Sequence, residues 1–388
     1  MSANSLPAHP ALSLSDSHPD RPAVTEGGRQ ILDLLLKTGG LSQAEITHRL
    51  TLSQPTVARL LQGFQKAGLV RTSQRQADRP GNPSVNVSLE ADHSFSLGIA
   101  LLGDVLSVGL MDLSGRLRAT RTTAMTDMSR FSVLSTLQRF HNDLLEETSV
   151  PPTRIIGAGL GISAFYVEPE RFNPPRYLDD WAFHDIAPII ETALGYPTLV
   201  DNDGTVAAIG ESLFGAGRTS QNFAYLHLSN GFGGGLICSG QPYRGQNGNA
   251  GEFGGVWILE DEGYPNLDLL KAILTDRGQT FETVEDMVLA IDRTVDGVDL
   301  WLDEAEKPFS RLASLIAYIL DPQKIVIGGR LPKDIAQALA DRIRIPSPTL
   351  RRERPAPLPE VIISQTEGDP VVLGAAAMPL QKAYFICP

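Results

Sequence analysis

The chain has 388 residues, which exceeds the usual size of one domain and predicts two or three. Its formal net charge is −12, yet residues 21–90 hold nine Lys and Arg against five Asp and Glu, so only this stretch suits contact with nucleic acid. Two cysteines without metal-ligand spacing exclude a disulfide framework, and no apolar run approaches the roughly 20 residues that cross a bilayer. We expect a cytoplasmic protein that does not contact a membrane.

Residues 1–24 are rich in Ser, Pro, Ala and His, and this composition predicts a disordered leader. The next segment, residues 25–90, is predicted to be a winged helix-turn-helix. Its first helix is expected to begin near Glu26 and to end at Gly39-Gly40, with leucines that pack beneath the helices that follow.

Two further helices of this segment have clear start signals. Ser42 and Glu45 form the capping box of a short helix that ends near Leu50. After the tight connection of residues 51–52, Ser53 caps a second helix with apolar residues at i, i+3, i+4 and i+7. Two short helices joined in this way are typical of a helix-turn-helix that reads DNA, although an amphipathic helix pair of other purpose would share the pattern.

The polar face of the second helix carries the residues that we expect to touch DNA. Gln54, Thr56 and Arg59 are predicted to reach base edges in the major groove. Turn residues then separate two extended runs, which predicts a hairpin wing. Arg79 and Asn82 of this wing are predicted to contact phosphate or the minor groove.

From residue 94 onward the pattern is that of an alternating α/β protein. Strand-like runs over residues 95–125 predict a hairpin meander, and an apolar run at residues 155–162 predicts a strand that is covered on both faces. Residues 197–200 form another buried strand, which ends in Asp201-Asn202-Asp203. Polar residues at the carboxyl end of such a strand lie where α/β sheets bind ligands.

The second half again alternates strands and helices. His227 lies inside a strand pattern at residues 223–228 and is expected to be a hydrogen-bonded core histidine. The glycine-dense segment 229–235 predicts either a turn that approaches a ligand or a tight hairpin. Residues 371–383 predict a closing helix that is kinked or interrupted at Pro379.

The order of these motifs resembles the ROK family of repressors, open reading frames and kinases, and in particular its transcriptional-repressor branch. Behind the winged helix-turn-helix come the meander, the Val-Asp-Asn-Asp run before a helix with Gly-Glu, and glycine-rich segments at 231–235, 248–254 and 328–329. The resemblance covers nearly the whole chain behind the leader. It implies an α/β, actin-like (sugar-kinase-type, RNase H-like) body of two lobes, residues 94–202 and 203–388. A ligand cleft would lie between the lobes, with the C-terminal helix packed back on the first.

The chain departs from the family's kinases at the grip for phosphate and metal. The kinases place an Asp-x-Gly-x-Thr type motif in the first hairpin, where this chain has Ala100, Leu102 and Asp104. Ala100 lacks a carboxylate for magnesium, Leu102 blocks close backbone approach, and Asp104 would turn a negative charge toward the phosphates. Because phosphoryl transfer depends on charge neutralisation, we predict a sensor that is not an enzyme.

The structural zinc of the family is not expected either. The family commonly has a His after Gly-Glu-x-Gly and then a cluster of three cysteines. This chain has Gly255 at the His position and no cysteine in residues 256–268. Because zinc needs about four such ligands, we predict neither a metal nor a cofactor.

Residues for sugar contact follow from the resemblance, position by position. They are Asn202, Asp203 and Glu252, with Asp268 as a looser match. Carboxylates and amides suit sugars because they pair with ring hydroxyls. Asp203 holds the position of the kinases' general base and could also cap the helix that follows it, while Glu252 could instead be a solvated loop acid. Trp181 is expected to fill the core in preference to stacking on a sugar.

The sequence therefore predicts a DNA-binding transcriptional repressor that senses a sugar or sugar derivative. Its winged helix-turn-helix would bind a pseudo-palindromic operator in double-stranded DNA as a homodimer or homotetramer. A small-molecule effector, expected to be a carbohydrate, would change the angle between the lobes through different affinity for the two states. Two alternatives stay open: an active ROK sugar kinase with a fused DNA-binding domain, and a regulator whose cleft no longer binds a sugar.

Overall fold

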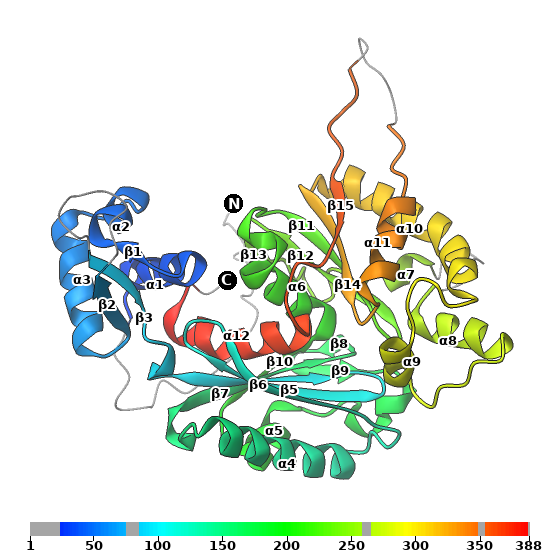
Figure 1. Ribbon diagram of the computed structural model, residues 1–388, viewed down its shortest axis with the longest axis horizontal. Helices are drawn as coiled ribbons and strands as arrows, with labels where there is room; N and C mark the ends of the chain where they lie inside the picture. The colour runs from blue at the N-terminus through cyan, green and yellow to red at the C-terminus, as the bar shows by residue number, and fades with distance from the viewer. Residues whose placement is uncertain (1–23, 75–84, 258–264, 348–353, 387–388) are drawn as a thin grey trace, which may run out of the picture.

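The computed structural model describes residues 24–74, 85–257, 265–347 and 354–386 (Figure 1). Most of the predicted leader, and the wing residues Arg79 and Asn82, lie outside the described residues. The described part consists of a small N-terminal winged domain and a larger body with two five-stranded sheets. Within it, no helix combines the length and the apolar character needed to span a bilayer.

The winged domain has the predicted helix-turn-helix and hairpin. The side chains of Thr25, Ser42 and Ser53 each accept a hydrogen bond from the backbone N–H three residues on, and so begin its three helices. The predicted capping box between Ser42 and Glu45 is present. Apolar side chains from all three helices form its core. In chain order the elements are α1 (Glu26–Thr38), β1 (Leu41–Ser42), α2 (Gln43–Arg49), α3 (Gln54–Lys66), β2 (Val70–Gln74) and β3 (Val85–Leu89).

The first sheet of the body contains the predicted meander. β4, β5 and β6 pair antiparallel, and β7 and β10 then extend the sheet parallel to β4. Helices α4 and α5 lie on one face of this sheet, and α12 lies on the other (Figure 1). The bounds are β4 (Phe95–Leu101), β5 (Val105–Asp112), β6 (Leu117–Ala124), α4 (Arg130–Thr148), β7 (Ile155–Ile162), β8 (Phe165–Glu168), β9 (Arg171–Asn173), α5 (Ala187–Leu194) and β10 (Thr198–Asn202).

The second sheet has the strand order β13-β12-β11-β14-β15. α6 packs against its β11 and β12 and also against β7 and β10 of the first sheet, and so joins the two sheets. α10 and α11 pack on the opposite face of the second sheet. The bounds are α6 (Asp203–Phe214), β11 (Phe223–Leu228), β12 (Phe232–Cys238), β13 (Gln241–Pro242), α7 (Gly254–Trp257), α8 (Leu267–Asp276), α9 (Val284–Ala290), α10 (Val298–Leu320), β14 (Lys324–Gly329), α11 (Lys333–Arg342), β15 (Glu360–Ile363) and α12 (Pro370–Tyr384).

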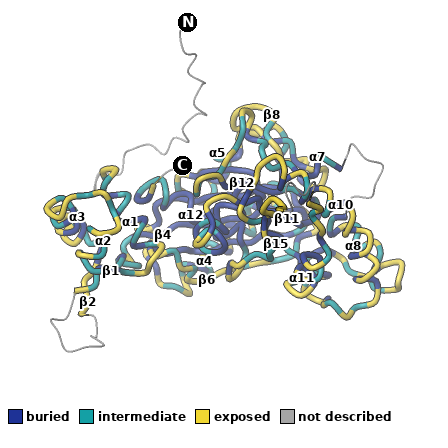
Figure 2. Tube along the Cα trace, turned by 90° about the horizontal axis from the view of Figure 1, so that it is seen from above, coloured by how far each residue is buried: buried dark blue, intermediate teal, exposed yellow. Residues whose placement is uncertain are grey.

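Glycines allow α12 to pack backbone to backbone in the centre of the body. A Cβ at Gly374 of α12 would collide with the carbonyl oxygen of Val206 in α6, and a Cβ at Gly159 of β7 would collide with that of Ala375. Figure 2 shows the result: buried positions concentrate in α12 and the central strands, whereas α3 is largely exposed.

One local prediction is resolved and another is corrected. Of the two alternatives for residues 229–235, the tight hairpin is confirmed: residues 229–231 connect β11 to β12, and Gly233, Gly234 and Gly235 belong to β12 and not to a turn. α6 packs closely on this strand, since a Cβ at Gly235 would lie 2.7 Å from the Cβ of Ala208. Helix α12 continues through Pro379 without interruption. Its packing on both neighbouring elements stabilises the helix where local propensity would break it.

Candidate functional site

A cavity of about 410 Å³ lies at the carboxyl end of β10, and this volume is typical of sites for small molecules. All four residues predicted to contact the ligand line it: Asn202, Asp203, Glu252 and Asp268. Its walls come from the loop after β7, the start of α6, the turn between β11 and β12, and the start of α8. The other lining residues are Ser163, Ala164, Phe165, Asn173, Pro174, Pro175, Tyr177, Ser229, Asn230, Gly231, Phe232, Gly233 and Asn266.

Asn202 ends β10 and begins α6. Its Oδ1 accepts a hydrogen bond from the backbone N–H of Thr205 at 3.0 Å, so Asn202, and not Asp203, is the N-cap of the helix. Its Nδ2 donates to the carbonyl of Ala164 at 2.7 Å and to Oε1 of Glu252 at 3.1 Å. The alternative of Asp203 as the cap is therefore wrong, and the Asp203 carboxylate has other partners.

Asp203 is buried at the base of the cavity. Its Oδ2 accepts from the Ser163 hydroxyl and lies 3.7 Å from Nε2 of His227, while its Oδ1 accepts from the N–H of Gly204. His227 lies in the core, as predicted, but neither of its ring nitrogens has a hydrogen-bond partner among the described residues. Burial lowers the pKa of His227, which favours the neutral ring.

Two further acids extend this polar wall. Burial, and then the charge of Asp203, raise the pKa of Glu252 to about 7, so near neutral pH its carboxyl group can donate as well as accept a hydrogen bond. Glu252 is half-buried and bonded to Asn202, which rules out the alternative of a solvated loop acid. Asp268 lies in the first turn of α8, and burial followed by the charge of Asp104 raises its pKa.

The cavity also contains residues that sequence reasoning missed. Phe165 and Tyr177 line it, with 43% and 37% of their surface exposed, and offer ring faces to a ligand. Asn230 and Asn266 add amide groups. Asn230 lies in the glycine-dense segment 229–235 that the sequence singles out. Phe165 in β8, Tyr177 after β9 and Asn266 at the N-cap of α8 stand in no motif and reach the cavity only through the fold.

Asp104 has a different role from the one predicted. It lies at the tip of the β4–β5 hairpin, where its Oδ1 accepts from Nη1 of Arg330 at 2.7 Å. Its Oδ2 accepts from the backbone N–H groups of Val284 and Glu285, and Nη2 of Arg330 also binds the Glu285 carboxylate at 2.9 Å. The charge is thus bound to Arg330 and to the start of α9, because cationic and N–H donors surround it.

The exposed side of α3 contains the residues predicted to read DNA. Gln54 and Arg59 are exposed on it. Thr56 is partly buried, and its Oγ1 lies 2.8 Å from Oγ of the capping Ser53. α3 projects from the winged domain on the side away from the body (Figure 1).

Comparison with known proteins agrees with this arrangement. Residues 97–265 match the ROK family, and residues 29–79 match the MarR family. The chain carries a ROK-family domain behind a MarR-type winged helix. Its fold is that of a winged helix followed by an actin-like, sugar-kinase-type α/β body, as predicted.

Three similar proteins illustrate the range of this likeness. Protein y4fQ of Sinorhizobium fredii is 27% identical, over 95% of this chain and 94% of its own length. The xylose repressor of Bacillus spizizenii is 24% identical over 59% of each chain, so the match spans less than two thirds of that repressor. A crystal structure of a ROK family transcriptional regulator, a homologue of the E. coli MLC protein, has a TM-score of 0.64 at 20% identity, over 92% of this chain and 96% of that one. Glucokinases are also similar to the ROK domain.

The interior of the ROK domain contains Trp181 in the predicted core position. Its side chain is fully buried, and Nε1 donates to the carbonyl of Met128 at 2.9 Å, which excludes stacking on a ligand. Within the described ranges, no group of three or more His, Cys, Asp or Glu side chains is arranged to hold a metal ion. Part of the segment after Gly255 lies outside those ranges.

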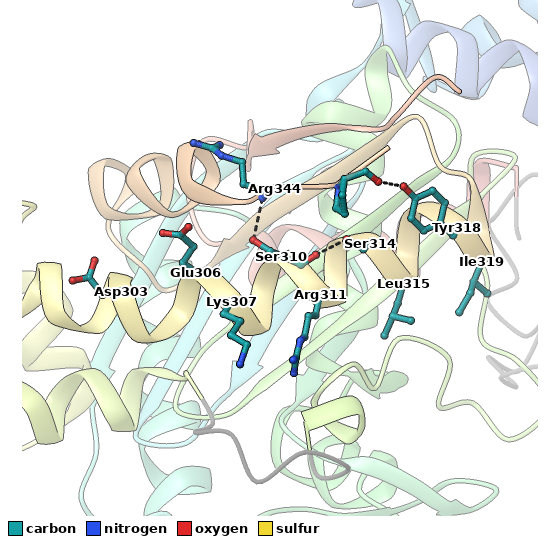
Figure 3. A pocket seen from close by; sticks show the side chains of 11 residues that line it. Asp303, Glu306, Lys307, Ser310, Arg311, Ser314, Leu315, Tyr318, Ile319 and Arg344 are labelled. Atoms are coloured by element: carbon teal, nitrogen blue, oxygen red, sulfur yellow. Dashed lines mark hydrogen bonds between the residues drawn. The ribbon is translucent and has the colours of Figure 1, made fainter. Parts of the chain in front are cut away.

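A second, larger hollow of about 810 Å³ runs along α10 of the ROK body (Figure 3). It contains none of the residues predicted for ligand contact. Polar groups that line this hollow bind one another: the backbone N–H of Arg344 donates to Oγ of Ser310, and the Tyr318 hydroxyl donates to the carbonyl of Pro346. Leu315 and Ile319 are exposed along it. Convergent polar groups distinguish the smaller cavity, and we assign the candidate ligand site there.

Proposed function

We propose that the chain is a DNA-binding transcriptional regulator, specifically a repressor, whose ROK body senses a sugar. The observation that carries the proposal is the combination of two features on one chain. An exposed polar helix face on a winged helix-turn-helix is suited to DNA, and a cavity walled by Asn202, Asp203, Glu252 and Asp268 is suited to a small polyhydroxylated ligand. The names of the xylose repressor and of the ROK regulator support the same assignment.

The ligand is proposed to be an unphosphorylated sugar. Three of the described residues that line the cavity carry a carboxylate, and no described lining residue is Lys or Arg. A phosphate group would be repelled there, because it would enter without a cationic partner. Hydroxyl groups, by contrast, can both donate to Asp203 and accept from a protonated Glu252.

We propose further that this ROK body does not transfer phosphate. Ala100 and Leu102 are buried, and Asp104 is held by Arg330 and by backbone N–H groups at the start of α9. The hairpin tip is thus bound to other residues of this chain, at the position where the kinases of the family bind phosphate. Without that grip, the charge of a transferred phosphoryl group would stay unneutralised.

Sugar binding would act on DNA through the geometry of an oligomer. Two winged domains of a homodimer or homotetramer would read two half-sites, and their separation would depend on the angle between the lobes of each body. A sugar that binds one lobe arrangement better than the other shifts the population toward it. The occupied state would then bind the operator with a different affinity.

The DNA part is tested by selection from random-sequence double-stranded DNA with the full chain, followed by gel retardation. We expect recovery of a pseudo-palindrome. Arg59→Ala should weaken binding by about 1–3 kcal/mol and relax specificity at one position of each half-site, because it removes one base contact. Gln65→Ala, at an exposed position near the C-terminal end of the same helix, is the control and should have little effect. Failure to retain any sequence contradicts the proposal.

The sugar part is tested by thermal unfolding of the full chain with D-glucose, D-xylose, other neutral sugars and glucose 6-phosphate. A neutral sugar that binds raises Tm with its concentration, and glucose 6-phosphate should not. Asn202→Ala should abolish the rise, whereas Gln138→Ala on exposed α4 should preserve it. Absence of any rise across the panel would favour a regulator whose cleft has lost its ligand.

A sugar kinase with an appended DNA-binding domain is the second candidate. The similarity of the ROK domain to glucokinases favours it, as does the position of Asp203, a buried carboxylate that faces the cavity. A coupled assay for sugar-dependent ATP hydrolysis separates the two functions. Turnover above background would establish the kinase and contradict our proposal for this cleft.

A further inference from the structure

The joint between the winged domain and the body contains a single arginine with three backbone partners. Nη1 of Arg29, on α1, donates to the carbonyl oxygens of Gln381 at 3.3 Å, Lys382 at 3.1 Å and Phe385 at 2.7 Å. These carbonyls belong to the last turn of α12 and its C-cap. One side chain of the winged domain thus binds the backbone carbonyls at the C-terminal end of a helix of the body.

The chemistry of this contact is specific to a cation. The last carbonyls of a helix lack intrahelical donors, and the helix dipole adds partial negative charge at that end. A guanidinium group satisfies several such acceptors at once and keeps its charge at any pH that the protein meets. Around the contact, Oγ of Ser94 lies 2.8 Å from the hydroxyl of Tyr384, and Leu36 of α1 packs over the turn at Gly115.

α12 is connected to the candidate ligand cavity through helix α6. Asp369 caps the other end of α12, where its Oδ1 accepts from the backbone N–H groups of Val371 and Val372. Along its length α12 packs on α6 with backbone contact at Gly374, so the two helices cannot slide freely. α6 begins at the cavity with Asn202. The joint with the winged domain and the cavity therefore share one tightly packed helix pair.

We propose that Arg29 is a positioning residue: it fixes the orientation of the winged domain on the end of α12, the helix that packs on α6, and α6 begins at the cavity. This inference rests on the proposed function, because it explains how the sugar-sensing body holds the DNA-binding domain in one orientation. Without the Arg29 contacts the winged domain would sample several orientations about its connection to β4.

The orientation is measured by double electron–electron resonance on the full chain. One spin label is attached to Cys238, which is exposed, and the other to a Gln62→Cys substitution on the exposed face of α3, with Cys387→Ser to prevent a third label. We expect a narrow distance distribution for the parent chain and a broad one for Arg29→Met. Arg29→Lys, which keeps a cation, should restore part of the narrow component. Arg49→Met, an exposed arginine of α2, should change nothing.

The consequence for DNA binding is measured on the unlabelled chain with a fragment recovered by selection. If the competent orientation falls to about a tenth of the population, the apparent affinity of Arg29→Met falls about tenfold. Thermal unfolding identifies a variant that does not fold, and Arg29→Lys then serves in its place. An unchanged distance distribution, or a broadened one without loss of affinity, overturns the inference. Absence of DNA binding by the parent chain would refute the proposed function, whereas the distance distribution still decides whether Arg29 fixes the winged domain.

Discussion

The winged domain and the ligand cavity are built from interactions of very different sequence range. Each helix of the winged domain is started by a side chain that binds a backbone N–H three residues away, as at Ser42 and Ser53. In the cavity, Asn202 meets Glu252 from 50 residues away, and the nearby pair of Asp104 and Arg330 spans 226 residues. Local signals therefore shape the DNA reader, whereas the cavity depends on the packing of the whole body.

The largest expected effect tests the tight packing of the body. Gly374→Ala places a Cβ against the backbone carbonyl of Val206, so we expect the free energy of unfolding to fall by about 3 kcal/mol. Gly63→Ala in α3 is the matched control. No atom lies within 4 Å of a Cβ at that position, so this substitution should stabilise α3 by about 1 kcal/mol. Urea unfolding of both variants measures the contrast, and equal effects would contradict it.

The next effect tests the contact between the lobes. Asp104→Ala removes the partner of Arg330 and two acceptor contacts for the start of α9, while Arg330 keeps Glu285. Because both charges of the pair are mostly buried, we expect a loss of about 2 kcal/mol in the free energy of unfolding. Asp276→Ala, at an exposed position of α8, should cost little. A similar loss for both would show that the contact does not join the lobes.

A pH series sharpens the comparison at the cavity. Burial raises the pKa of Glu252 from 4.5 to about 7, so the folded state binds a proton that the unfolded state releases. The stability from this proton is complete below about pH 4.5 and is lost as pH rises through 7. Relative to the parent chain, Glu252→Gln should therefore gain up to about 2 kcal/mol between pH 5 and pH 8. Urea unfolding at both pH values measures this difference, and a pH-independent difference would show that Glu252 titrates normally.

The smallest effect belongs to the winged domain. Ser53→Ala removes the side chain that caps α3, which should cost about 1 kcal/mol and increase hydrogen exchange in the first turn of that helix. Ser73→Ala on exposed β2 is the control and should leave exchange in α3 unchanged. Protection that is unaltered in Ser53→Ala would show that packing against α2 and β2, and not the cap, holds the start of α3.

Sequence reasoning reached the elements more readily than the contacts between them. Caps, glycines and the apolar period predicted the start of α3 and the meander, because these signals act within a few residues. The same reasoning placed Gly233–Gly235 in a turn, since nothing nearby reveals that α6 packs against that strand. It likewise turned the charge of Asp104 toward phosphates, because its partner Arg330 lies 226 residues further along the chain.

The sequence by itself determined the winged helix-turn-helix, the order of strands and helices in the body, and the polar residues after β10. Capping, periodicity and glycine placement are local, and they need no knowledge of the rest of the chain. Only the tertiary structure decided that Phe165 and Tyr177 join the predicted residues at the cavity, and that Arg29 binds the carbonyl oxygens at the end of α12. Such contacts arise when distant segments pack, and the free energy that selects them is spread over the whole core.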